Sequence, residues 1–168
     1  MNLLFLCTGN SCRSQMAEGW ARQLAPEWLK VDSAGIESHG KNPRAIAVMD
    51  QAGVDISAQE STRLTDAMLQ WADYVVTVCG HADEHCPVLP PGVRKEHWPL
   101  EDPAKAAGSD EDVTAVFRAS RDEVRARVEA LIGRLTAQRA ATADPDDSES
   151  RTAPASSPAR RLPRWWAC

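Results

Sequence analysis

Two short segments along the chain have the apolar character of buried β-strands, and two more polar segments can form short strands. Residues 2–6 form an apolar run, and residues 74–78 form a second one that is rich in β-branched side chains. Runs of this kind are typical of parallel sheets, whose strands are covered on both faces. Residues 30–34 and 94–98 are the two short, more polar candidates. The pattern therefore predicts four strands between residues 2 and 98.

Helical spacing of apolar positions fills the intervals between these strands and the region after them. Residues 15–24 have this spacing, and residues 42–53 begin at an Asn-Pro pair and stop at a glycine. Thr65 can cap a short helix that runs through Leu69. A long helix with one apolar face is predicted from Asp112 through Leu135.

Alternating strands and helices predict an α/β fold, with a four-stranded parallel sheet and flanking helices in a single domain. Ligands of such sheets bind beyond the carboxyl ends of the strands. Cys7 and Cys79 both follow predicted strands directly, so we expect them at that edge.

The helical pattern stops near residue 139 of the 168-residue chain. We therefore predict a folded domain over residues 1–139 and a disordered tail over residues 140–168, because the tail is rich in Ala, Ser, Pro, Asp and Arg. The tail ends in Trp165, Trp166, Ala167 and Cys168, to which we assign no function.

Charge and cysteine content narrow the classes of function. The net charge of −5 and the pI near 5.4 argue against nucleic acid and membrane surfaces as partners. No run approaches the about 18 apolar residues of a membrane span, and no charged leader opens the chain, so we expect a cytoplasmic monomer. Five unevenly spaced cysteines do not resemble a secreted disulfide scaffold, and in a reducing compartment they are expected to serve chemistry.

The most informative segment lies between the first strand and the first helix and reads Cys-Thr-Gly-Asn-Ser-Cys-Arg-Ser. Such a loop can bind a tetrahedral oxyanion through backbone N–H groups and the coplanar donors of Arg13, with Cys7 as the nucleophile. Asn10 can adopt a left-handed conformation and tie the loop together, and Ser14 can lower the pKa of Cys7 by a hydrogen bond. The predicted substrate-binding residues are Thr8, Gly9, Asn10, Ser11, Cys12, Arg13 and Ser14. The alternative is a buried structural cysteine beside a surface arginine.

A second candidate group is Asp102, which precedes a rigid proline in a loop after the fourth predicted strand. A carboxyl group held there can donate or accept a proton over the mouth of a pocket. The alternative is an ordinary Asp-Pro turn.

Cys79 and Cys86 flank a polar segment that contains His81 and His85. Two thiolates and two imidazoles can form a tetrahedral zinc site, but His85 and Cys86 are adjacent and the ligands form one cluster rather than two pairs. The other interpretation is redox chemistry, in which one thiol reaches Cys7 and the second attacks the first, on a flexible segment that begins at Gly80.

Several separated motifs together resemble one family. They are residues 7–19, residues 33–37 (Ser-Ala-Gly-Ile-Glu), Cys79 and Cys86, residues 95–98 (Lys-Glu-His-Trp), and residues 102–104 (Asp-Pro-Ala). In this order they are similar to the thioredoxin-coupled arsenate reductases, which have the fold of the low-molecular-weight protein tyrosine phosphatases. The resemblance covers residues 1 to about 138.

The resemblance implies a relay of three cysteines that reduces arsenate to arsenite. Cys7 would attack bound arsenate with Asp102 as the acid, Cys79 would attack Cys7 and release arsenite, and Cys86 would attack Cys79. Thioredoxin would then reduce the Cys79–Cys86 disulfide, and no tightly bound cofactor is needed. Cys12 resembles a supporting residue.

Some relatives hold a potassium ion with an asparagine, a glutamate, a serine and an aspartate. The first three resemble Asn10, Glu18 and Ser33, but Thr62 occupies the fourth position. Because a hard cation prefers carboxylate oxygens, we expect at most a weak potassium site.

Three other functions compete with this one. A tyrosine phosphatase shares the loop but needs water rather than a second thiol to resolve its intermediate, and we expect weak phosphatase activity as a by-product. An arsenic sensor would need a DNA-binding element, and no basic helix or patch is evident. A low-molecular-weight thiol could replace thioredoxin, but relatives of that kind do not need a cysteine in the position of Cys86.

Overall fold

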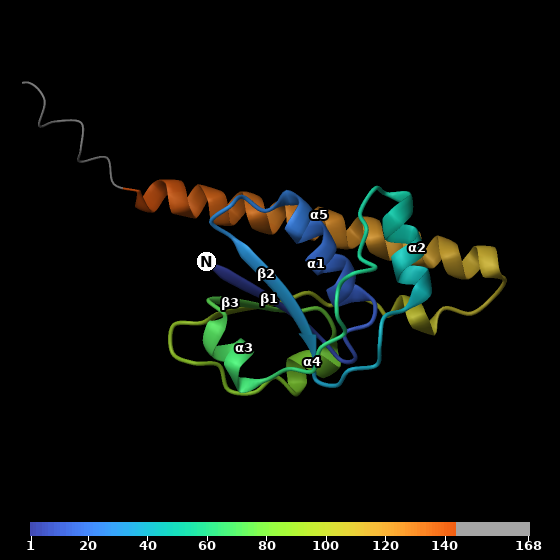
Figure 1. Cartoon of the computed structure of the whole chain (residues 1–168), viewed down its shortest axis with the longest axis horizontal. Coiled ribbons are helices and arrows are strands. Elements are labelled where there is room, and N and C mark those ends of the chain that lie inside the picture. The colour runs from blue at the N-terminus through green and yellow to red at the C-terminus, as the bar shows by residue number, and fades with distance from the viewer. Residues whose placement is uncertain (144–168) are drawn as a thin grey trace, which may run out of the picture.

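The computed structural model describes residues 1–143, which form a four-stranded parallel sheet with helices on both faces (Figure 1). The strands run in the order β2-β1-β3-β4 across the sheet. The elements are β1 (Asn2–Cys7), α1 (Arg13–Leu24), β2 (Lys30–Gly35), α2 (Pro43–Gln51), α3 (Asp66–Trp71), β3 (Tyr74–Thr77), α4 (Gly80–Glu84), β4 (Arg94–His97), a 3-10 turn (Pro103–Lys105) and α5 (Asp110–Thr142). The predicted α/β architecture and the parallel sheet are confirmed.

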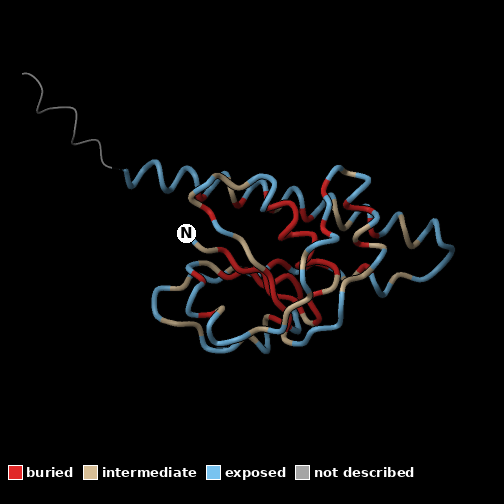
Figure 2. Tube along the Cα trace, viewed as in Figure 1, coloured by how far each residue is buried: buried red, intermediate tan, exposed pale blue. Residues whose placement is uncertain are grey.

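The first strand lies in the middle of the sheet and forms much of the core. The side chains of residues 3–6 are fully buried, in agreement with the apolar run (Figure 2). β1 pairs with β2 through Cys7 opposite Gly35, and with β3 through Leu6 opposite Thr77. The carboxyl ends of β1 and β3 are therefore neighbours, which brings the segments that carry Cys7 and Cys79 to the same edge.

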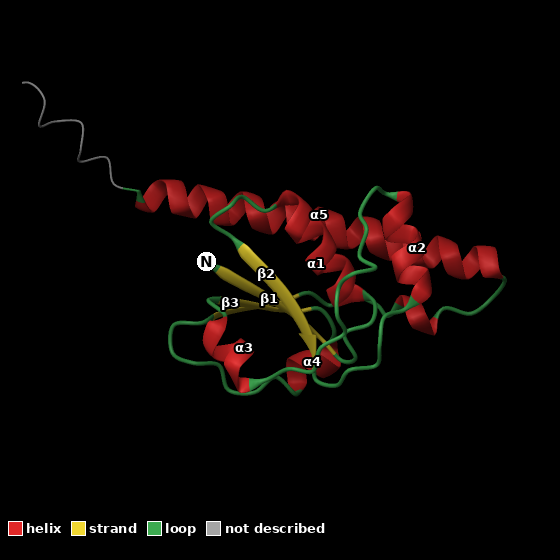
Figure 3. Ribbon diagram, in the orientation of Figure 1, coloured by secondary structure: helices red, strands yellow, loops and turns green. Residues whose placement is uncertain are grey.

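Helices cover the two faces of the sheet unequally. α1, α2 and α5 lie on one side, and α3 and α4 lie on the other (Figure 3). The long helix α5 packs against α1 and α2 through one face, whose buried residues are Phe117, Val124, Val128, Leu131 and Leu135. This face is the one that the apolar spacing predicts.

Helix ends follow the capping groups that precede them. Asn42 accepts hydrogen bonds from two backbone N–H groups at the start of α2, and Thr65 accepts one at the start of α3, as predicted. α5 begins at Asp110, two residues earlier than predicted, because Ser109 and Asp112 form a capping box. α1 also begins earlier, at Arg13.

The carboxyl-terminal boundary differs from the predicted one. α5 continues to Thr142, so residues 140–142 of the predicted tail belong to a helix. Residues 144–168, including Cys168 and the two terminal tryptophans, lie outside the described residues. Within residues 1–143, no helix has both the length and the apolarity to cross a membrane.

Candidate active site

The loop between β1 and α1 is fixed on its outer side by the segment after β2. The backbone N–H groups of residues 36, 37, 39 and 42 donate to the carbonyl groups of Cys7, Thr8, Gly9 and Ser11, at 2.8–3.1 Å. Engaging the carbonyl groups in this way leaves the loop's N–H groups for an anion, as in other backbone nests. α1 begins at Arg13 directly after the loop and adds the positive end of its dipole.

Asn10 ties the loop together from within the protein. Its backbone φ of 47° confirms the predicted left-handed conformation, and its side chain is fully buried. Nδ2 donates to the hydroxyl groups of Ser14 (2.9 Å) and Ser33 (2.8 Å). Oδ1 accepts from the Thr62 backbone N–H (2.8 Å) and from Gln15 Nε2 (3.0 Å). Four hydrogen bonds therefore hold the side chain that sets the shape of the loop.

Arg13 and Asp102 meet across the site, although 89 positions separate them in the chain. The Nη2 atom of Arg13 lies 3.3 Å from Asp102 Oδ2, and Nη1 donates to the Leu100 carbonyl at 2.8 Å. Arg13 is 6% exposed, and its Nε has no hydrogen-bond partner among the described residues. Because an unpaired buried donor costs about 1–3 kcal/mol, this atom favours a bound oxyanion.

These groups line one cleft of about 760 Å³ at the carboxyl edge of the sheet. Of the predicted site residues, the cleft contains Cys7, Thr8, Gly9, Ser11, Cys12, Arg13, Cys79 and Asp102. Asn10 and Ser14 are fully buried and are not among its lining residues, so they support the loop rather than face the cleft. Cys86 does not line the cleft either.

Cys7 and Cys79 line the same cleft, and their thiols are close enough to shift each other's pKa. The hydrogen bond that the Cys7 thiol donates to Cys79, together with burial, raises the pKa of Cys7 against the opposing effect of Arg13. The hydrogen bond with Cys7, aided by Thr8 and by the Ala82 N–H, lowers the pKa of Cys79 to about 5. Because two interacting groups titrate as a pair, this pair carries one thiolate at neutral pH.

This pairing corrects the prediction for Ser14 and Cys7. Ser14 accepts a hydrogen bond from Asn10 and is not one of the groups that shift the pKa of Cys7. In this state the charge is favoured on Cys79, since its sulfur lies 3.3 Å from Thr8 Oγ1 and 3.4 Å from the Ala82 backbone nitrogen. The predicted preference for a Cys7 thiolate is therefore wrong for this arrangement of the thiols.

The segment between Cys79 and Cys86 is a short helix rather than an irregular flexible stretch. Cys79 caps α4, and Cys86 follows its last turn in a partly buried position, where burial raises the pKa of its thiol. α4 was missed because five residues are too few for a helical period to appear in the sequence.

Asp83 tethers α4 to the sheet. Its carboxylate accepts a hydrogen bond from Thr77 Oγ1 (2.9 Å) and forms an ion pair with Lys95 Nζ (2.8 Å). Thr77 is fully buried at the end of β3, and Lys95 belongs to β4. The helix that precedes Cys86 is thus held to the sheet by polar contacts.

Two histidines also line the cleft: His39, which sequence reasoning missed, and His81, which it considered only as a zinc ligand. His39 packs so closely on Gly9 that a Cβ at position 9 would meet its ring, and His81 Nδ1 lies 3.3 Å from Thr8 Oγ1. His81 also stacks on His85, with ring centroids 4.1 Å apart. In the sequence, the only local sign of a site is Gly40 beside His39 and the Cys79-Gly80 pair before His81.

The possible potassium ligands are already engaged with protein groups. Both acceptor positions of Asn10 Oδ1 are used, and Ser33 Oγ donates to Glu18 Oε2 at 2.6 Å. The other oxygen of Glu18 forms an ion pair with Arg22 at 2.7 Å. Thr62 contributes its backbone N–H, which is a donor and not a cation ligand. These residues do not fit a potassium ion.

His, Cys, Asp and Glu side chains in residues 1–143 form no group of three or more that could hold a metal ion. The four zinc ligands considered from the sequence include His81 and His85, which stack on each other instead.

A family model described as low molecular weight phosphotyrosine protein phosphatase matches residues 2–141. An arsenate reductase of Bacillus subtilis (strain 168) is 54% identical over 127 residues, which cover 75% of this chain and 91% of that protein. An arsenate reductase of Staphylococcus xylosus is 50% identical over 127 residues, with 76% and 92% covered.

Solved structures agree in fold. An arsenate reductase in the phosphate binding state is 40% identical with a TM-score of 0.64, over 79% of this chain and 97% of that one. A thioredoxin-dependent arsenate reductase of Corynebacterium glutamicum is 28% identical with a TM-score of 0.66, over 82% of this chain and 62% of that one. Because the family model spans most of the sequence, this chain belongs to the low molecular weight phosphotyrosine protein phosphatase family, and it is similar to arsenate reductases.

Proposed function

We propose that this protein reduces arsenate to arsenite by a relay of three cysteines, Cys7, Cys79 and Cys86, with thioredoxin as the external reductant. The observation that carries the proposal is that Cys7 and Cys79 line one cleft beside an oxyanion-binding loop, close enough for each thiol to shift the pKa of the other. A phosphatase resolves its covalent intermediate with water and does not need a second thiol beside its nucleophile.

The first step is capture of the oxyanion and formation of a sulfur–arsenic bond. The loop N–H groups and the unpaired Nε of Arg13 supply donors for the arsenate oxygens. Cys7 attacks arsenic(V), and one arsenic–oxygen bond breaks as Asp102 protonates the departing oxygen, which leaves as water. The proton that Cys7 loses can pass to Cys79 through the hydrogen bond between them.

Reduction takes place in the second step. Cys79 attacks the sulfur of Cys7, which forms the Cys7–Cys79 disulfide and breaks the sulfur–arsenic bond. The electron pair of that bond stays on arsenic, which departs as arsenite, and a proton passes to one of its oxygens. Thiolate stabilisation at Cys79, by Thr8 and by the first turn of α4, favours this attack.

The third step moves the disulfide away from the cleft. Cys86 attacks Cys79, forms the Cys79–Cys86 disulfide and releases Cys7 as a thiolate. Release of α4 from its Asp83 tether would allow Cys86 to approach. The two electrons are then restored by the dithiol of thioredoxin, and the Corynebacterium glutamicum relative described as thioredoxin-dependent supports that choice.

The rival proposal is a phosphatase, and weak phosphatase activity is expected because phosphate and arsenate share charge and shape. Tyr74, the one tyrosine of the chain, lies in β3 and donates to Glu96 at 2.7 Å, away from the residues that line the cleft. Among the described residues, no Tyr, Trp or Phe lines the cleft, so no aromatic pair is found there that would hold a phosphotyrosine ring.

The test is multiple turnover of arsenate with thioredoxin and its reductase by wild type, Cys79→Ser and Cys86→Ser. The relay predicts turnover by wild type alone, and a loss of at least about a hundredfold in each variant, because each removes a thiol that no other group replaces. Cys168→Ser is the matched control, since it also replaces a cysteine but one to which we assign no function, and it should retain turnover. Full multiple turnover by Cys86→Ser would refute the three-cysteine relay.

A further inference from the structure

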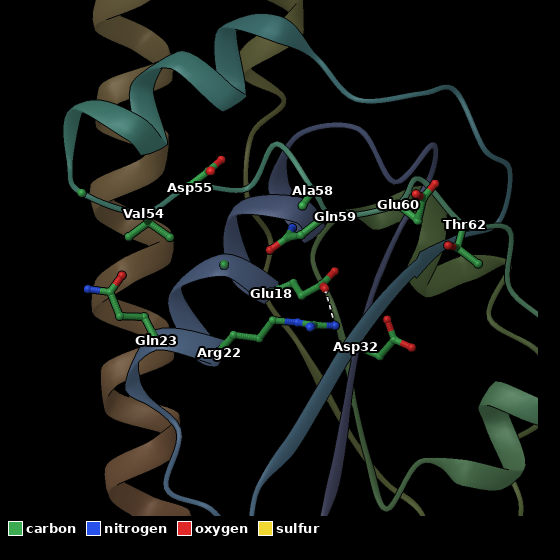
Figure 4. A pocket seen from close by; sticks show the side chains of 12 residues that line it. Glu18, Arg22, Gln23, Asp32, Val54, Asp55, Ala58, Gln59, Glu60 and Thr62 are labelled. Carbon is green, nitrogen blue, oxygen red and sulfur yellow. Dashed lines mark ion pairs between the residues drawn. The ribbon is translucent and has the colours of Figure 1, made fainter.

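A second cleft, of about 680 Å³, lies behind the anion-binding loop and is strongly acidic (Figure 4). Its carboxylates come from four separate positions, Glu18, Asp32, Asp55 and Glu60. Arg22 is the one basic residue among the described residues that line it. The guanidinium end of Arg22 reaches the space between the Glu18 and Asp32 side chains.

Glu18 is the member of this group that most needs a counter-charge. Its side chain is 4% exposed, and its Oε1 lies 2.7 Å from Arg22 Nη2, one helical turn further along α1. Removing the partner of a buried ion pair leaves an uncompensated charge, which costs far more than losing a surface pair. Burial raises the pKa of Glu18, and the hydrogen bond from Ser33 and the charge of Arg22 both act against this, so both partners stabilise the carboxylate.

Glu18 is connected to the loop by a directed series of hydrogen bonds. Its second oxygen accepts from Ser33 Oγ at 2.6 Å, and Ser33 Oγ accepts from Asn10 Nδ2 at 2.8 Å. Because the Ser33 hydroxyl has one hydrogen, donating it to Glu18 leaves only acceptor positions toward Asn10. The acceptor offered by Ser33 is thus one of the contacts that orient the Asn10 amide, together with Ser14 on Nδ2 and the Thr62 backbone N–H on Oδ1.

We propose that Arg22 is a positioning residue whose guanidinium serves as a built-in counter-cation for the loop, acting through Glu18, Ser33 and Asn10 to hold the oxyanion-binding geometry. This proposal rests on the proposed function only in taking the loop as an oxyanion site.

The test compares the affinity of wild type and Arg22→Ala for inorganic phosphate, at a temperature at which circular dichroism shows both to be folded. The matched control is Arg127→Ala, which removes an i, i+4 ion pair of similar length (3.0 Å to Glu123), but one whose carboxylate is 51% exposed, against 4% for Glu18. Arg22→Ala is expected to bind phosphate about tenfold more weakly, as for loss of a hydrogen bond to a charged group, whereas Arg127→Ala binds as wild type does. Arg22→Lys, which retains the charge, restores most of the affinity.

Equal phosphate affinity of Arg22→Ala and Arg127→Ala would overturn the proposal. A requirement of wild type for KCl over NaCl in phosphate binding would also overturn it, because the cation would then come from solution. Both measurements are independent of reduction. If the cysteine relay is wrong, the expected phosphate affinities stay the same. If the phosphate affinities contradict the role of Arg22, the relay is not affected.

Discussion

Replacing Asn10 tests how the loop is built, because this residue combines a left-handed backbone with a fully buried side chain. Asn10→Ala removes two donated hydrogen bonds, to Ser14 and Ser33, and two accepted ones, from Gln15 and the Thr62 backbone. Alanine is also disfavoured at the observed φ of 47°.

The magnitude follows from these losses. Four hydrogen bonds at a net value of about 1 kcal/mol each give about 4 kcal/mol, reduced wherever a released partner finds another group. The left-handed backbone adds about 1 kcal/mol for alanine. We therefore expect the free energy of unfolding to fall by about 3–5 kcal/mol, which is a large share of the about 5–15 kcal/mol typical of a domain.

The assay is equilibrium denaturation in urea, with Asn10→Gly as the matched control. Glycine loses the same side-chain bonds but accepts the positive φ, so we expect Asn10→Gly to be more stable than Asn10→Ala by up to about 1 kcal/mol. A loss below about 1 kcal/mol in Asn10→Ala would refute the reasoning, because it would mean that the four bonds do not hold the loop.

Three further predictions concern the thiols, the packing and the tether. Because the pKa of Cys79 is lowered to about 5, ultraviolet titration of wild type should show a thiolate at neutral pH that is lost below about pH 5. Cys79→Ser should titrate at a different pH, because Cys7 then loses the partner that raises its pKa; an unchanged titration curve in Cys79→Ser would contradict this. Gly35→Ala should lower the free energy of unfolding by about 2–3 kcal/mol, because the new Cβ would lie 2.7–2.8 Å from backbone atoms of the loop. In the control Gly133→Ala, in α5, the new Cβ meets no neighbour, so the free energy of unfolding should rise by about 0.5–1 kcal/mol. Equal effects of the two substitutions in urea denaturation would contradict the close packing of Gly35 against the loop. Asp83→Asn should weaken the attachment of α4 and increase the rate at which iodoacetamide alkylates the cysteine after that helix, measured by mass spectrometry, and an unchanged rate would show that the contact does not tether it.

Much of the fold was predictable because its signals are local. The apolar run of β1, the Asn42 and Thr65 caps and the apolar face of α5 each act through neighbouring residues or a regular period. The earlier start of α5 depends on a capping box between Ser109 and Asp112, and α4 is too short to show a period. These elements were therefore misplaced or missed.

The candidate site was only partly predictable, because its energetics depend on contacts across the chain. The loop sequence alone indicates the left-handed Asn10 and a nucleophilic cysteine. The lowered pKa of Cys79 arises from Cys7 and Thr8, which lie more than seventy positions away, and no pattern near Cys79 encodes that contact. The same holds for Arg22, whose importance appears only once Ser33 of the adjacent strand lies against Glu18.

The most direct test of the relay is disulfide mapping after a single turnover with arsenate and no external reductant. Wild type should release one arsenite per chain and accumulate the Cys79–Cys86 disulfide. Cys86→Ser should also release one arsenite but stop at the Cys7–Cys79 disulfide, because the third thiol is missing. Arsenite release by Cys86→Ser without a bond between Cys7 and Cys79 would contradict the account.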